Sequence, residues 1–163
     1  MNTIASTVLH CLDRPALLTA YFDGSCALCS AEMKALHELD RDGTIEFVDC
    51  ASPAFDDSAM GAEGITREEM LQALHVRDVL GDWHRGVDAI ALLYASAGAP
   101  RIARLWVHPL TRPIARWMYP LVVRHRHALS AMGMHFVSPA VLRRFASRRP
   151  RCDHDTCRTG HLF

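Results

Sequence analysis

The sequence has no apolar run long enough to cross a bilayer, which takes about 20 predominantly apolar residues in a helix. Its best stretch, residues 105–123, is interrupted by His108, Arg112 and Arg116. The first residues, MNTIASTVLHCLDRP, also lack the basic start, long apolar segment and small-residue cleavage site of a secretory signal. We therefore expect a cytoplasmic protein without a transmembrane segment.

The chain has no net charge, because 18 acidic residues balance 18 lysines and arginines. This balance hides a division, since residues 1–98 carry a net charge of −10 and residues 101–163 a net charge of +10. A basic half can bind phosphates or anionic lipid, or it can be neutralised by the acidic half or simply be solvated. We favour neutralisation by the acidic half or simple solvation, and we expect no nucleic acid partner.

The basic half also contains aromatic residues and paired histidines. Trp106, Trp117 and Tyr119 lie among arginines and could form an interfacial amphipathic surface, but core packing is the simpler prediction. His125 and His127 flank Arg126, and this stretch fits the solvated end of a basic helix better than a pair of metal-ligating histidines.

Length and patterning predict one main α/β core. With 163 residues, half of them hydrophobic, the chain can bury one core. We predict a core over residues 15–98, a helical extension packed on it over 99–149, and a flexible tail over 150–163. Apolar runs and turn signals predict strands at 17–22, 44–48, 74–79 and 83–85.

Helices are predicted between and after these strands. The first begins at Cys26 after a possible N-cap at Ser25 and ends before Gly43, and a capping box at Thr66 starts a short helix that ends near Ala73. Further helices are expected over 87–96, 101–108, 113–127 and 139–148. The order is β-α-β, a short helix, then β-β-α, with a basic C-terminal helical extension.

The stretch YFDGSCALCS, residues 21–30, places two thiols three positions apart where the first strand passes into the first helix. A C-x-x-C pair at this place is typical of redox chemistry. Cys29 recurs with Met33 and Leu36 at the i, i+4, i+7 spacing of one helical face, so we expect it to be buried against the sheet. Cys26 is expected at the accessible junction.

The position of the two thiols suggests different roles for them. Only the thiolate is nucleophilic, and a helix N-terminus lowers the pKa of a thiol below its ordinary value near 8.5. We therefore predict that Cys26 attacks a disulfide and that Cys29 resolves the mixed disulfide. Asp23, which precedes Cys26 by three residues, could accept the proton of Cys29 or could fix the turn at Gly24 by an Asx-type hydrogen bond.

Residues 17–130 resemble the DCC family of thiol-disulfide oxidoreductases. The family is named for the Asp, Cys and Cys of a D-G-x-C-x-x-C motif, which correspond to Asp23, Cys26 and Cys29 here. The resemblance implies a thioredoxin-like fold and a protein-disulfide oxidoreductase activity on a thiol or disulfide substrate, expected to be a protein, without a cofactor. Thioredoxin-like enzymes commonly present backbone to the substrate from a cis-proline before the third strand, but this chain has Met-Leu-Gln-Ala at 70–73.

Two other functions remain open at this stage. A zinc-stabilised module could use Cys26, Cys29, Cys152 and Cys157, and a binding protein could use the basic surface without redox activity. A separate zinc site at Cys152, His154, Cys157 and His161 is disfavoured because the spacing matches no standard finger. We expect Cys50 to fill space in the core or at the strand edge, assign no role to Cys11, and predict no bound metal.

Overall fold

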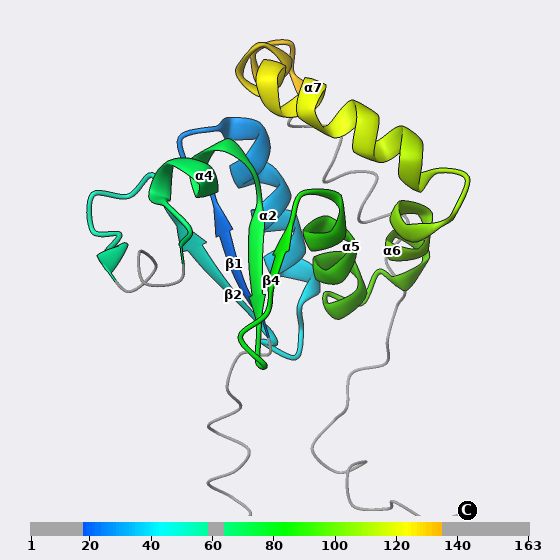
Figure 1. Ribbon diagram of the computed structural model, residues 1–163, viewed down its shortest axis with the longest axis horizontal. Helices are drawn as coiled ribbons and strands as arrows, with labels where there is room; N and C mark the ends of the chain where they lie inside the picture. The colour runs from blue at the N-terminus through cyan, green and yellow to red at the C-terminus, as the bar shows by residue number, and fades with distance from the viewer. Residues whose placement is uncertain (1–17, 59–63, 135–163) are drawn as a thin grey trace, which may run out of the picture.

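A four-stranded mixed sheet forms the centre of the protein (Figure 1). The computed structural model describes residues 18–58 and 64–134. The strand order is β2-β1-β3-β4, with β1 parallel to β2 and antiparallel to β3, and β3 antiparallel to β4. The strands are β1 (Leu18–Phe22), β2 (Ile45–Asp49), β3 (His75–Asp78) and β4 (Trp83–Arg85). Each lies within two residues of its predicted bounds.

The described helices follow the predicted order along the chain. They are α2 (Ala27–Leu39), α4 (Arg67–Gln72), α5 (Val87–Ser96), α6 (Pro100–Val107) and α7 (Arg112–Ala131). The α/β class is confirmed, and the β-α-β and β-β-α halves are consistent with a thioredoxin-like fold. The helix predicted at 139–148 and the tail at 150–163 lie outside the described residues, and the domain boundaries stay a prediction.

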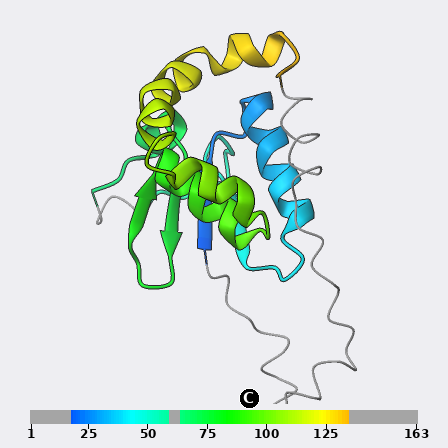
Figure 2. The same ribbon diagram turned by 90° about the vertical axis from the view of Figure 1, so that its right-hand side faces the viewer.

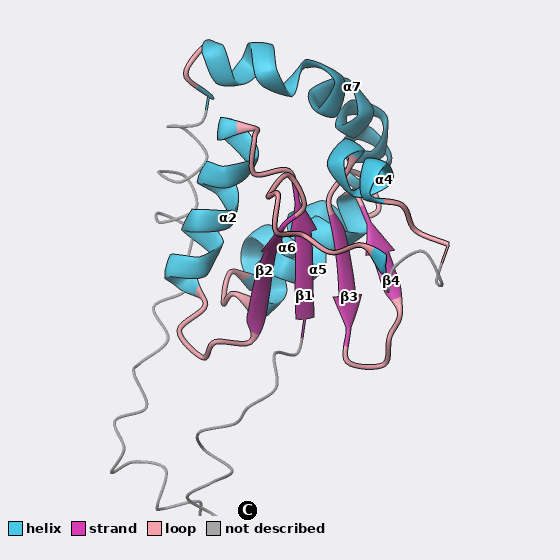
Figure 3. Ribbon diagram, turned by 90° about the vertical axis from the view of Figure 1, so that its left-hand side faces the viewer, coloured by secondary structure: helices cyan, strands magenta, loops and turns pink. Residues whose placement is uncertain are grey.

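One face of the sheet packs against α2, α5 and α6. Side chains alternate between faces along a strand, so β1 turns Leu18 and Ala20 toward these helices. Met33 and Leu36 of α2 and Leu93 of α5 meet them in the main hydrophobic cluster. Figure 3 shows α5 and α6 behind the sheet in that view, with α7 across its upper end. The face predicted for Met33 and Leu36 is therefore confirmed.

The opposite face of the sheet carries a smaller cluster covered by α4. Tyr21 of β1 packs there with Cys50 and with Met70 of α4. Cys50 is fully buried, its sulfur lies beside that of Met70, and burial raises the pKa of its thiol to about 11. Cys50 therefore fills space in the core, as predicted.

Helix α7 lies across the end of the sheet at which β1 ends and α2 begins (Figures 1 and 2). Arg112 and Arg116 of α7 pair with Asp88 of α5 at 2.9 and 3.2 Å, so the acidic half neutralises part of the basic half. Trp106 packs against the main core, whereas Trp117 is 77% exposed. The prediction of core packing is wrong for Trp117, which lies on the outer side of α7.

The capping box predicted at Thr66 is present and generates a stability prediction. The Thr66 hydroxyl accepts the Glu69 N–H at 3.2 Å, and the Glu69 carboxylate accepts the Thr66 N–H at 2.9 Å. Thr66→Ala should lower the free energy of unfolding by about 1 kcal/mol because the helix loses an N-cap acceptor. Urea unfolding measures the change, and Thr66→Ser, which keeps the hydroxyl, should stay within a few tenths of the parent. Equal losses for the two variants would contradict the assignment.

Candidate active site at the start of helix α2

Cys26 is the N-cap of α2, the position that sequence analysis assigned to Ser25. Its backbone is extended, with φ −89° and ψ 112°, and its side chain accepts the N–H of Cys29 with an Sγ···N distance of 3.4 Å. The sulfur thus takes the place that a serine or aspartate oxygen usually has at a helix start. The expected N-cap at Ser25 was wrong by one residue.

The two sulfurs lie side by side as free thiols. Cys29 Sγ donates a hydrogen bond to Cys26 Sγ at 2.9 Å. The pKa of Cys29 is raised far above its ordinary value, first by burial and then by the hydrogen bond to Cys26 and the charge there. Cys29 therefore keeps its proton at neutral pH, and Cys26 Sγ is the sulfur that accepts hydrogen bonds.

The exposure of the two thiols is the reverse of what the helical pattern predicts. Cys26 is fully buried, with 0% of its surface exposed, and Cys29 is only partly buried. The N-cap side chain turns back over the first turn toward the Cys29 N–H, which removes it from the surface. Cys29 lines a cavity between α2 and α7, and it is not part of the main hydrophobic cluster to which Met33 and Leu36 belong.

Asp23 fixes the turn that leads from β1 to α2. Its Oδ1 atom accepts the Ser25 N–H at 3.0 Å and the Ser25 hydroxyl at 2.5 Å. The hydrogen bond to the residue two positions on is the Asx-type contact expected at Gly24. The Asp23 side chain is only 5% exposed, so its charge needs a partner.

That partner is Arg126 of α7, which lies 103 residues further along the chain. Arg126 Nη2 donates to Asp23 Oδ2 at 2.6 Å, and its Nη1 donates to the Leu71 carbonyl at 2.6 Å. The Arg126 side chain is 17% exposed, whereas His125 and His127 are exposed. The prediction of a solvated helix end is therefore wrong for Arg126, and no local pattern in the sequence indicates this pair.

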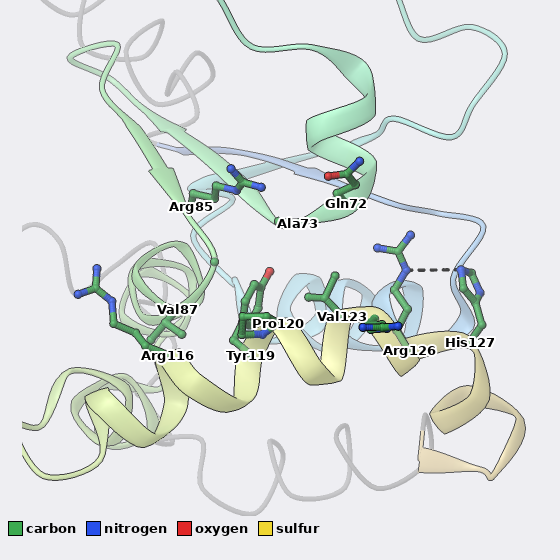
Figure 4. Close-up of a pocket in the computed structure, with 12 residues that line it drawn as sticks. Gln72, Ala73, Arg85, Val87, Arg116, Tyr119, Pro120, Val123, Arg126 and His127 are labelled. Atoms are coloured by element: carbon green, nitrogen blue, oxygen red, sulfur yellow. Dashed lines mark hydrogen bonds between the residues drawn. The ribbon is translucent and has the colours of Figure 1, made fainter.

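Helix α7 also contacts the backbone that precedes β3. The Leu74 N–H donates to the Tyr119 hydroxyl oxygen at 3.0 Å. Figure 4 shows Tyr119, Val123 and Arg126 on the side of α7 that faces Ala73 and Gln72. The described residues contain no cis peptide bond. The backbone that a thioredoxin-like enzyme presents to its substrate is thus in contact with α7 here.

A mostly apolar cavity of about 360 Å³ lies between α2, α5 and α7. Cys29 lines it together with Glu32, a residue that sequence analysis did not single out. The Tyr94 hydroxyl donates a short hydrogen bond to Glu32 Oε1, and burial raises the pKa of the Glu32 carboxyl. The sequence signal that could have indicated Glu32 was its spacing from Cys29, because residues i and i+3 of a helix are neighbours on its surface.

Gly24 allows the closest approach in the turn. A Cβ atom at this position would lie 2.1 Å from Asp49 Oδ2. The Asp49 carboxylate cannot easily give way, since its Oδ1 atom accepts the N–H groups of Gly24 and Ala51, each at 2.8 Å. The Gly of the D-G-x-C-x-x-C motif therefore admits the carboxylate that ends β2.

The described residues, 18–58 and 64–134, contain no group of three or more His, Cys, Asp or Glu side chains placed to hold a metal ion. Cys11 lies outside these ranges, and so do the candidate zinc ligands Cys152, His154, Cys157 and His161. None of the helices in the described part of the chain is long and apolar enough to span a membrane.

Comparison with known proteins gives one family match. The model of the DCC1-like thiol-disulfide oxidoreductase family matches residues 20–132, which confirms the resemblance found in the sequence. No match to the chain was found among curated proteins or among solved structures. The matched range contains Asp23, Cys26, Cys29 and Arg126.

Removing the cation beside Asp23 should destabilise the protein. Arg126→Met leaves a buried carboxylate without its partner, so the free energy of unfolding should fall by about 3 to 5 kcal/mol. Asp23→Asn together with Arg126→Met should cost less than the sum of the single changes, because the second change removes the stranded charge. Urea unfolding of all four proteins in the cycle gives the coupling energy. A coupling of zero would show that the pair has no energetic role.

The raised pKa of Glu32 predicts a pH-dependent stability. Below its ordinary pKa of 4.5, Glu32 is protonated in the folded and the unfolded chain. As the pH rises above 4.5 the unfolded chain ionises first, so stability falls until the folded carboxyl also ionises. Glu32→Gln should therefore match the parent near pH 4 and exceed it in unfolding free energy at pH 8. A difference that does not change with pH would contradict the raised pKa.

Proposed function

The chain belongs to the DCC1-like thiol-disulfide oxidoreductase family, and from this we propose that Cys26 and Cys29 exchange electrons with a thiol or disulfide substrate. The observation that carries the proposal is the hydrogen bond from Cys29 Sγ to Cys26 Sγ at the start of α2. A sulfur that accepts two donors beside a helix N-terminus is suited to carry negative charge. Cys26 is therefore the proposed nucleophile.

The proposed reaction has two steps. The Cys26 thiolate attacks one sulfur of a substrate disulfide, forms a mixed disulfide and releases the other sulfur as a thiolate. Cys29 then loses its proton and attacks Cys26 Sγ, which releases the second substrate thiolate and forms the Cys26–Cys29 disulfide. Two electrons have passed from the dithiol to the substrate, and the reverse sequence oxidises a substrate dithiol. No cofactor takes part.

The geometry of the sulfur pair supports the second step. The two Sγ atoms are 2.9 Å apart, about 0.9 Å more than the roughly 2.0 Å of a disulfide bond. A small adjustment of the first helical turn therefore closes the bond. Asp23 keeps this turn in place through its hydrogen bonds to Ser25 and its ion pair with Arg126, and we propose a positioning role for it.

Access to Cys26 requires a local movement. Its side chain has no exposed surface, so a substrate sulfur reaches it only when covering side chains move away. We propose that the cover opens at α7, because Arg126 of this helix binds Asp23, three residues before Cys26, and Tyr119 binds Leu74 just before β3. A protein substrate would then meet the same backbone groups that α7 contacts in this structure.

Replacement of single cysteines tests the assignment. Cys29→Ser should accumulate a mixed disulfide on Cys26 when the protein reacts with a small disulfide, because the resolving thiol is gone. Cys26→Ser should leave no such adduct within residues 21–30, and Cys50→Ala should behave like the parent. Peptide mass spectrometry under non-reducing conditions locates the adduct, which separates it from adducts on Cys11, Cys152 or Cys157. An adduct on Cys29 in Cys26→Ser, with none on Cys26 in Cys29→Ser, would overturn the assignment.

A further inference from the structure

The cavity beside Cys29 contains few groups that can exchange a proton. The second step of the proposed reaction requires Cys29 to lose its proton inside this mostly apolar space of about 360 Å³. Elements on all sides contribute the titratable or charged groups that line it, which are Asp23 after β1, Cys29 and Glu32 of α2, Tyr94 of α5, and Tyr119 and Arg126 of α7. The acceptor must be one of these groups or a water that connects to them.

Asp23 is poorly suited to take this proton. Its Oδ1 atom already accepts two hydrogen bonds from Ser25, and its Oδ2 atom is paired with Arg126 at 2.6 Å. A proton on either oxygen would displace a charge-assisted hydrogen bond, which is among the stronger polar interactions in a protein. Both oxygens of Asp23 are thus occupied, one by the turn at Ser25 and the other by Arg126 of α7.

Glu32 lines the same cavity but, unlike Asp23, has no ion pair with an arginine or lysine among the described residues. It follows Cys29 by three residues on α2, and side chains at this spacing lie about 5 to 6 Å apart at Cβ. Its hydrogen bond comes from the neutral Tyr94 hydroxyl, and among the described residues no arginine or lysine pairs with it. A carboxylate that is partly desolvated and lacks a cation gains from taking up a proton.

We propose that Glu32 accepts the proton of Cys29 when Cys29 attacks the mixed disulfide on Cys26. This inference rests on the proposed function. In the step, the Cys29 S–H proton passes to the Glu32 carboxylate, the Cys29–Cys26 bond forms, and the bond from Cys26 to the substrate sulfur breaks. The substrate leaves as a thiolate, and Glu32 later returns the proton to solvent. In the reverse direction the protonated Glu32 protonates Cys29 as it leaves.

The electrostatics of the intermediate agree with this role. Burial is the largest cause of the raised Cys29 pKa, and the Cys26 sulfur supplies the next two. Once Cys26 is in a mixed disulfide it carries no charge, so the contribution of burial remains as the main barrier to ionisation. Burial also raises the pKa of the Glu32 carboxyl above its ordinary value, and a carboxylate with a raised pKa takes up a proton more readily.

Stopped-flow reaction with 2,2′-dithiodipyridine separates the two steps. The 163-residue chain with Cys11→Ser, Cys50→Ala, Cys152→Ser and Cys157→Ser should release one equivalent of thiopyridone when Cys26 attacks and a second when Cys29 resolves. Glu32→Gln should slow the second release about 100-fold or more at pH 7 and leave the first unchanged. Glu38→Gln, an exposed change on the same helix, should alter neither release.

The pH profile distinguishes proton transfer from a structural role. The second release in the parent should rise with pH and level off once Glu32 is ionised. In Glu32→Gln it should continue to rise, so the difference between the two proteins shrinks at high pH. Equal second releases at every pH, or a deficit that is constant with pH, would overturn the role of Glu32. Absence of the first release from Cys26 would instead overturn the proposed oxidoreductase mechanism itself.

Discussion

The ion pair between Asp23 and Arg126 is the interaction on which the arrangement of the site depends. It joins the turn that presents the dithiol to a helix more than a hundred residues later, and both charges are largely removed from water. Burying two charges costs free energy that only close, well-directed contact offsets. The pair therefore specifies one position of α7 over the start of α2, and this position gives Cys26 and Cys29 their surroundings.

The position of α7 separates the environments of two sulfurs that are only one helical turn apart. Cys26 sits at the helix N-terminus with donors from the Cys29 backbone and thiol, while Cys29 faces a cavity closed by α7. Burial and the hydrogen bond to Cys26 raise the pKa of the Cys29 thiol, so Cys29 keeps its proton. Cys26 accepts the hydrogen bonds of this pair, and an exchange reaction with a defined order of attack needs two neighbouring thiols that differ in this way.

The burial of the dithiol places two requirements on the proposed mechanism, which are access of the substrate to Cys26 and removal of the proton from Cys29. Cys26 has no exposed surface, so the proposed attack on a substrate requires covering side chains to move away. The cavity beside Cys29 is mostly apolar, so a carboxyl group that lines it is a candidate acceptor for the Cys29 proton. Asp23 and Glu32 both line this cavity, but Asp23 is paired with Arg126, whereas Glu32 accepts a hydrogen bond from Tyr94.

The sequence by itself determined the α/β class, the order of strands and helices, the capping box at Thr66 and the placement of the C-x-x-C pair at the start of the first helix. These features follow from local rules, namely side-chain periodicity, turn residues and capping. Which sulfur is buried, which carboxyl is paired and where α7 lies were decided only by the tertiary structure. Arg126 meets Asp23 and Tyr119 meets Leu74 across long chain separations, and contacts of that kind leave no periodic signal in the residues between them.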